Sequence, residues 1–252
     1  MSKSPIAADE ASLRSDVRRL GDLLGQTLVR QEGPELLALV EEVRKAVREG
    51  SGAETLAQLN VEDSVQLVRA FSTYFHLANV AEQVHRARVL AGVRETGGSW
   101  LARAVDRIEA ALKTQTPGHE LTKEEITEWV SAMSVRPVFT AHPTEAARRS
   151  VLNKLGSIAD LLDDPRNPSQ QDRLAEAVDL LWQTDELRLG RPEPLDEALN
   201  ALYYLDDLFT QTVPEVLNDF AKEMKRIDVE VPITARPLSF GNWIGGDRDG
   251  NP

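Results

Sequence analysis

The 252-residue chain contains no cysteine. This absence excludes disulfide bonds and thiolate metal sites within it, and it fits a reducing compartment such as the cytoplasm. The sequence also lacks any apolar run that approaches the roughly 20 residues needed to span a bilayer, and its amino terminus has no signal-peptide core. We therefore expect a cytoplasmic protein that has no membrane partner.

Positive charge is scarce as well, with 29 lysines and arginines against 41 aspartates and glutamates and a net charge of -12. This balance argues against a nucleic-acid-binding surface. An anionic substrate would consequently need a local cluster of arginines. The share of hydrophobic residues, 41%, is nevertheless enough at this length to bury a sizeable core.

Helical periodicity dominates the stretch before Met133. Two apolar stripes at helical spacing are Leu13, Val17, Leu20, Leu24 and Leu28, and then Leu36, Val40, Val43 and Val47. Gly33-Pro34 separates the stripes, so we expect two helices that pack as a pair. Asn60 is expected to cap the long helix that follows, and Thr122 with Glu125 to form a capping box for a short one.

The second half of the chain also continues mostly as helix. Apolar residues at helical spacing predict one helix over 151–162, a second that ends at Arg188, and a long third from Leu195 to near Arg226. The aromatic residues of this half that we interpret as packed side chains are Trp182, Tyr203 and Tyr204. The predicted architecture is mainly α with a few parallel strands.

A first corner of chemical interest lies where a short apolar run meets this helical pattern. The β-branched run from Val135 to Phe139 favours a buried strand, with Pro137 at its start or on an edge. It leads into Thr140-Ala141-His142-Pro143-Thr144-Glu145, in which Pro143 fits a first helical turn. His142 therefore lies at the carboxyl end of a strand, where α/β folds place their chemistry.

His142 could act as a base at this corner, since an imidazole with a pKa of about 6.5 accepts protons at neutral pH. Arg148 and Arg149 follow shortly after it, and a helix start beside guanidinium groups suits an anion. A lone histidine in such a turn is also commonly a capping residue, and arginine pairs on helices are commonly solvated or ion-paired. The residues alone leave both roles open.

A second corner follows Leu238–Ile244, which is expected to be a strand containing a glycine. The chain continues as Gly245-Gly246-Asp247-Arg248-Asp249-Gly250-Asn251-Pro252. Glycines here let a ligand approach the backbone closely, and Arg248 stands between two carboxylates. A polar turn with local salt bridges is the alternative, whereas an EF-hand calcium loop is disfavoured because its acidic spacing and closing glutamate are missing.

Both corners carry a family resemblance. Val138–Glu145 and Gly241–Pro252 resemble signatures of phosphoenolpyruvate carboxylase. Further stretches that resemble this family are 70–86, 181–186 and 191–198. The similarity thus runs through nearly the whole chain.

The resemblance implies an enzyme that carboxylates phosphoenolpyruvate with bicarbonate, giving oxaloacetate and phosphate with Mg²⁺ or Mn²⁺. It implies a (β/α) barrel wrapped in extra helices and a homotetramer at full length. His142 would deprotonate carboxyphosphate, and Arg248 would bind the transferring phosphoryl group. The supporting residues that match the motifs or adjoin them are Thr144, Glu145, Arg148, Arg149, Gly245, Gly246, Asp247, Asp249 and Asn251.

Family members are considerably longer, so the resemblance implies that this is an amino-terminal part. We expect no metal ligands in this segment, since the acidic ligands of the family would lie downstream, and we expect the segment to be inactive alone. Its expected division is a helical region over 1–133 and an incomplete barrel over 134–252, which holds the first strands and long helices.

Two other functions stay open on the residues. One is a phosphotransfer enzyme in which His142 is phosphorylated, because imidazole is a competent nucleophile. The other is a non-catalytic helical interaction module. His76 and His85, on the long middle helix, have no partner at metal-ligand spacing and are interpreted as packing or surface residues.

Overall fold

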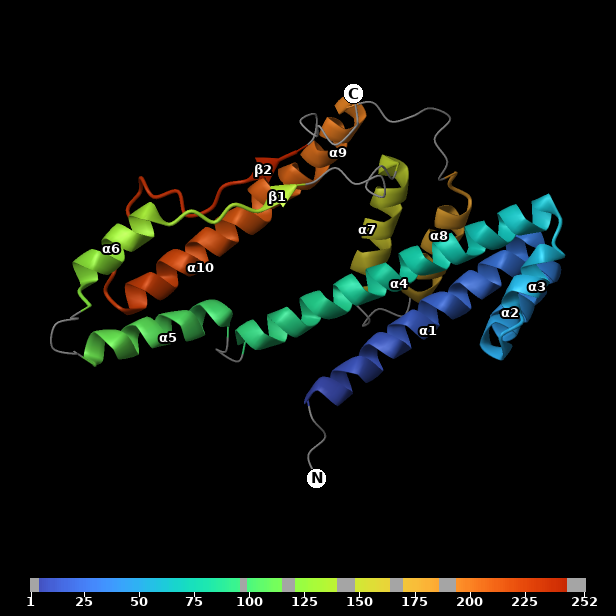
Figure 1. The fold of residues 1–252 in the computed structure, drawn as a ribbon, viewed down its shortest axis with the longest axis horizontal. Coiled ribbons are helices and arrows are strands. Elements are labelled where there is room, and N and C mark those ends of the chain that lie inside the picture. Colours follow the sequence, from blue (N-terminus) through green and yellow to red (C-terminus); the bar gives the residue numbers. More distant parts are fainter. Residues whose placement is uncertain are drawn as a thin grey trace. The chain divides into compact units, whose positions relative to one another are not determined.

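The chain is mainly helical and holds two short parallel strands, as the sequence predicts (Figure 1). The structure is a computed structural model that describes residues 5–95, 99–114, 121–139, 148–163, 170–185 and 194–243. The α-helices are α1 (Pro5–Glu32), α2 (Pro34–Glu49), α3 (Gly52–Ala57), α4 (Val61–Glu95), α5 (Trp100–Lys113), α6 (Lys123–Ala132), α7 (Arg149–Asp163), α8 (Gln170–Trp182), α9 (Pro194–Asp207) and α10 (Val213–Arg226). The strands are β1 (Val138–Phe139) and β2 (Gly241–Asn242). Among the described helices, none combines the length and the apolar character that a bilayer crossing requires.

Two compact units divide the chain, and each takes two stretches of sequence. Unit 1 consists of Met1–Ala91 and Arg148–Leu187, and unit 2 consists of Gly92–Ala147 and Arg188–Pro252. Both units draw on residues from either side of position 133. The expected division of the chain into residues 1–133 and residues 134–252 stays a prediction.

Unit 1 is built on the two apolar stripes near the amino terminus. α1 packs against α2 and α8, α7 packs against α8, and buried residues of α4 join the same core. The most deeply buried members of this core include Leu20, Leu28, Leu77, Ile158, Leu174, Leu181 and Trp182. The expected pairing of the first two helices is confirmed, although Val47 at the end of the second stripe is exposed.

The helix boundaries follow the local signals in the sequence. Gly33 adopts φ 100° and Pro34 opens α2, so the expected break occurs there. The Oδ1 of Asn60 accepts a hydrogen bond from the Asp63 backbone N–H at 2.9 Å and caps α4. The Thr122 side chain accepts from the Glu125 backbone while the Glu125 carboxylate accepts from the Thr122 backbone, which confirms the capping box.

Unit 2 has a second, smaller core between α5, α6 and α10. Its buried members are Val105, Ile126, Val130, Met224, Ile227 and Val229. The long helix expected from Leu195 to near Arg226 is confirmed in its extent, because α9 and α10 follow one another without a gap, but a π-helical turn over Leu208–Thr212 breaks its regular α-helical hydrogen bonding. Pro214 accounts for the break, since it has no N–H to donate to Thr210 and its ring would clash with that carbonyl.

The two strands pair in parallel, with Val138 opposite Gly241 and Phe139 opposite Asn242. An isolated bridge between Val135 and Leu238 extends the pairing backwards. Both strands lie where the sequence predicts them, but β1 is not buried as expected, because Val138 is 47% exposed. Val135, at the isolated bridge before β1, is 53% exposed. In the described part of the chain this ladder has no further strand on either edge, which explains the exposure.

The aromatic residues interpreted as packed behave differently from one another. Trp182 is 2% exposed and belongs to the core of unit 1, as expected. Tyr204 is exposed on α9, so the prediction is wrong for this residue. The side chain of Tyr203 lies outside the described residues.

Candidate functional site

The parallel pairing of β1 and β2 brings together the two strands that precede the corners singled out in the sequence. The carboxyl ends of neighbouring parallel strands lie at the same edge of a sheet. Phe139 and Asn242, which close the two strands, are paired residues at that edge. The strand ends that precede His142 and Arg248 in the sequence are therefore adjacent.

The reach of each segment is short. His142 is three residues beyond Phe139, and a chain of that length spans about 10 Å at most. Arg248 is six residues beyond Asn242, which allows about 20 Å. The length of chain therefore bounds how far each residue can lie from the paired strand ends.

Backbone hydrogen bonds fix the strand ends. The Gly241 N–H donates to the Pro137 carbonyl at 2.9 Å, and the Trp243 N–H donates to the Phe139 carbonyl at the same distance. Below them, the Arg136 Nε donates to the Ser239 Oγ at 3.3 Å. The register at the point where the corners start is consequently held by main-chain and side-chain contacts.

Aromatic side chains support the same strands. The rings of Phe139 and Phe240 lie 5.9 Å apart, and Phe240 contacts Phe209 of the π-helical turn edge-on at 5.2 Å. These contacts link β1, the residue before β2 and the π-helical turn between α9 and α10. The strand ends are thereby anchored to the helices of unit 2.

Comparison with known proteins decides the family. A sequence model of the family described as phosphoenolpyruvate carboxylase matches residues 13–252. The chain belongs to the phosphoenolpyruvate carboxylase family. Both corners lie inside the matched range, as do β1 and β2.

Individual relatives agree with the family match. The phosphoenolpyruvate carboxylase of Thermus thermophilus is 38% identical over 263 residues, which covers 100% of this chain and 29% of that protein. The phosphoenolpyruvate carboxylase of Pseudomonas aeruginosa is 37% identical over 262 residues, covering 96% of this chain and 29% of that protein. That of Azorhizobium caulinodans is 39% identical over 265 residues, covering 95% and 28%. The chain therefore spans less than a third of the length of these curated relatives.

Most of the motif residues of this chain fall outside the part that the structure describes. Those that do so are His142, Thr144, Glu145, Gly245, Gly246, Asp247, Arg248, Asp249 and Asn251. The structure describes the strands that precede these residues, β1 and β2. Their roles stay predictions.

Arg148 and Arg149 are the two candidate residues that the structure describes. Arg149 is the first residue of α7, and Arg148 directly precedes it and accepts the Val151 N–H at 2.8 Å through its carbonyl. The Arg148 guanidinium lies 3.7 Å from the Asp185 carboxylate. Arg148 therefore forms an ion pair, which is one of the two roles that the sequence left open for it.

Trp243 is a residue of this edge that the sequence reasoning did not single out. It follows β2 directly, and its indole is 54% exposed although it is large and aromatic. Its backbone N–H donates to the Phe139 carbonyl, so the side chain starts from a fixed point at the paired strand ends. The available signal was an aromatic residue two positions before the Gly-Gly pair.

The described residues form no evident binding site for a divalent cation. Within residues 5–95, 99–114, 121–139, 148–163, 170–185 and 194–243, no three histidine, aspartate or glutamate side chains gather in a way that could hold a metal ion. His76 and His85 both lie on α4 and both have interaction partners. The described donor set thus does not fit the metal that the family resemblance implies.

Proposed function

We propose that this chain supplies part of an enzyme that carboxylates phosphoenolpyruvate with bicarbonate, giving oxaloacetate and phosphate. The observation that carries the proposal is the parallel pairing of β1 with β2, which starts both family motifs at one edge of a sheet. Membership of the phosphoenolpyruvate carboxylase family supports it independently. The proposed chemistry would then take place between a histidine corner and an arginine corner.

Arg248 is proposed to act in the first step. A bicarbonate oxygen forms a bond to phosphorus while the bond from phosphorus to the enol oxygen breaks, which yields carboxyphosphate and the enolate of pyruvate. Negative charge spreads over the phosphoryl oxygens as the group transfers. A guanidinium matches that charge and geometry better than an ammonium group does.

His142 is proposed to act in the second step. Its imidazole takes the proton of the carboxyphosphate carboxyl group, the bond from carbon to the phosphate oxygen breaks, and carbon dioxide and phosphate result. The enolate carbon then forms a bond to carbon dioxide and gives oxaloacetate. A positioned general base of this kind contributes about 10²- to 10⁴-fold in rate.

The wider assembly is proposed on the family resemblance. β1 and β2 would be neighbouring strands of a (β/α) barrel, which agrees with a parallel pair joined by a long helical crossover. Magnesium or manganese would be held by ligands in the part of family-length chains that lies beyond this segment, and the family-length enzyme would be a cytoplasmic homotetramer. The residues that would support the site around His142 and Arg248 are Thr144, Glu145, Arg148, Arg149, Gly245, Gly246, Asp247, Asp249 and Asn251.

The role of His142 predicts a split between the two steps. In an enzyme of family length that carries this segment, His142→Asn should still release phosphate from phosphoenolpyruvate in a bicarbonate-dependent way. Oxaloacetate formation should fall by about 10²-fold or more. Coupled assays of phosphate and oxaloacetate measure the split, and His119→Asn, outside both motifs, serves as the matched control. Unchanged oxaloacetate output would refute the assignment, and acid-labile phosphate on His142 would point to phosphotransfer instead.

The proposed role of Arg248 predicts that its substitution slows the formation of both phosphate and oxaloacetate. Arg248→Ala should lower phosphate release and oxaloacetate formation together, because the phosphoryl transfer precedes both. We expect a fall in kcat/KM for phosphoenolpyruvate of about 10²-fold, with partial recovery in Arg248→Lys. Wild-type steady-state kinetics in the alanine variant would remove Arg248 from the site.

A further inference from the structure

The two strands of unit 2 are short, and their own hydrogen bonds are few. β1 and β2 contain two residues each, and in the described part of the chain no further strand pairs with either of them. An isolated pair of strands is at best marginally stable in water and needs packing against a helix. The position of the paired strand ends therefore depends on what packs against this ladder.

One face of the ladder is aromatic. The register of the strands places Phe240 opposite Pro137, and side chains alternate between the two faces of a strand. Phe139 and Phe240 therefore share a face, and their rings lie 5.9 Å apart. On the opposite face the strands approach closely, since a Cβ on Gly241 would meet the Val138 side chain at 3.1 Å.

Phe209 of the π-helical turn packs on the aromatic face. Its ring meets that of Phe240 at a centroid distance of 5.2 Å and an interplanar angle of 73°, an edge-on geometry that aromatic pairs prefer. Figure 1 shows both strands beside the point where α9 continues into α10. Phe209 thereby contacts the residue directly before β2, which in turn contacts the last residue of β1.

The π-helical turn determines where Phe209 points. Hydrogen bonds of such a turn run from residue i to residue i+5, so the turn accommodates one more residue than an α-helical turn and changes the direction of its side chains. Turns of this kind occur frequently at functional sites. Phe209 is 52% exposed, so burial in a core does not explain its position, whereas its contact with the ladder does.

We propose that Phe209 is a positioning residue for the carboxylation reaction, which acts through Phe240 to fix the separation of the two paired strand ends. This role rests on the proposed function, in which the segments that follow the strands carry His142 and Arg248. Phosphate release in the first step needs only the arginine corner, whereas the second step needs carboxyphosphate within reach of His142 as well. A shift between the strand ends should therefore impair the second step more than the first.

The ratio of the two products tests this role in an enzyme of family length that carries this segment. Phe209→Ala should lower the oxaloacetate formed per phosphate released by about threefold or more, since small misplacements of reacting groups cost large factors in rate. Phe209→Tyr keeps the ring, and its hydroxyl can reach water at this exposed position, so it should restore the wild-type ratio. A residue that only stabilises the fold would lower both products together and leave the ratio unchanged.

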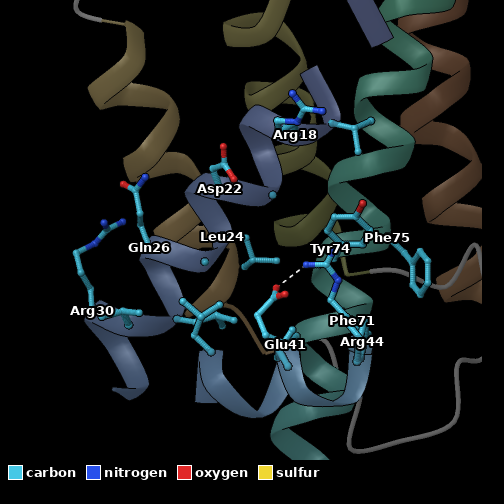
Figure 2. Close-up of a pocket in the computed structure, with 18 of the residues that line it drawn as sticks. Arg18, Asp22, Leu24, Gln26, Arg30, Glu41, Arg44, Phe71, Tyr74 and Phe75 are labelled. Carbon is cyan, nitrogen blue, oxygen red and sulfur yellow. Dashed lines mark hydrogen bonds and ion pairs between the residues drawn. The ribbon is translucent and has the colours of Figure 1, made fainter. Parts of the chain in front are cut away.

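Phe75 offers a matched control in unit 1. It is 61% exposed and meets Tyr74 edge-on at 5.9 Å on the wall of an apolar groove between α1, α2 and α4 (Figure 2). Phe75→Ala therefore removes an aromatic pair of the same kind at a similarly exposed position. A second control, Phe220→Ala, removes a ring that packs against the core of unit 2. Both controls should keep the wild-type ratio of oxaloacetate to phosphate.

Hydrogen exchange tests the contact of Phe209 without any catalysis. In the 252-residue chain, the amides of Gly241 and Trp243 donate hydrogen bonds to backbone carbonyls on the side of β1. Their exchange, followed by nuclear magnetic resonance, should accelerate about threefold to tenfold in Phe209→Ala. It should keep its wild-type rate in Phe209→Tyr and in Phe75→Ala.

Three results would overturn the proposal. A wild-type product ratio in Phe209→Ala would mean that the reaction does not depend on this contact, and unchanged amide exchange would mean that the strand ends do not. An equal fall of the ratio in Phe220→Ala would assign the effect to the stability of unit 2. The proposed function fails in a different way, because a wild-type enzyme that makes no oxaloacetate refutes it before any variant is compared.

Discussion

At the scale of single residues, Asp179 on α8 illustrates how long-range polar contacts complete the core of unit 1. Its carboxylate accepts hydrogen bonds from the Thr27 hydroxyl at 2.6 Å and from the Arg30 guanidinium at 2.8 Å, both on α1. Burial favours the neutral acid, but the hydrogen bonds from Arg30 and Thr27 outweigh it and hold the pKa of Asp179 below its ordinary value. The carboxylate form is thus tied to the folded state.

This lowered pKa predicts a specific dependence of stability on pH. A carboxyl group whose pKa is lower in the folded state contributes stability that is present above its unfolded-state pKa and is lost as the pH falls through its folded-state pKa. Asp179→Asn should reduce the free energy of unfolding by about 1 kcal/mol at pH 7. The difference from wild type should shrink below about pH 4. Urea unfolding at pH 7 and pH 3 measures both effects.

The matched control for Asp179 is Glu176→Gln, which also removes a carboxylate charge from α8 but at an exposed position away from the helix ends. It should alter the free energy of unfolding by less than about 0.5 kcal/mol at either pH. A loss in Asp179→Asn that is equally large at both pH values would contradict the role of its ionisation.

Trp182 marks what residue-level reasoning could and could not predict. Its burial was expected from its type and its helical context. Its partners were not, because the indole N–H donates to Glu32 at 2.9 Å and the Arg69 guanidinium lies 4.3 Å from the ring centroid. These partners are more than 100 positions away in sequence, and spacing within one helix carries no information about them.

At the scale of elements, the sequence predicts helix starts well because the interactions at a start are local. The caps at Asn60 and Thr122 each join residues three positions apart, and the break at Gly33-Pro34 involves neighbours. The end of α9, in contrast, could not be predicted from the spacing of apolar residues. Helical spacing continues from Leu195 to Val213 in the apolar residues, so the pattern conceals the π-helical turn that Pro214 causes.

In the candidate site as well, local features could be predicted from the sequence and long-range contacts could not. The positions of the two strands could be predicted from β-branched and glycine-containing runs, but their pairing could not, because Phe139 and Asn242 are 103 residues apart. The pairing is what brings the two motifs to one edge. Likewise, the ion pair of Arg148 with Asp185 depends on where α7 and α8 lie in the fold, not on local spacing.

At the scale of the whole molecule, the two units have separate hydrophobic cores. The core of unit 1 includes Ile158, and the smaller core of unit 2 includes Met224. Each unit assembles from stretches that are distant in sequence, since α1 packs against α8 and α5 against α10. Such assembly depends on long-range packing, which is why the order of elements along the chain does not reveal it.

Separate cores predict that a cavity in one unit loosens that unit first. Ile158→Ala and Met224→Ala remove comparable buried side chains and should each cost about 2–5 kcal/mol locally. Amide hydrogen exchange followed by mass spectrometry should then accelerate in α1, α7 and α8 for Ile158→Ala, and in α5, α6 and α10 for Met224→Ala. Each variant is the control for the other, because the unit that retains its core should keep its wild-type exchange rates. Equal acceleration of both sets of helices in both variants would mean that the chain unfolds as one cooperative body, since global unfolding exposes every amide regardless of where the cavity lies.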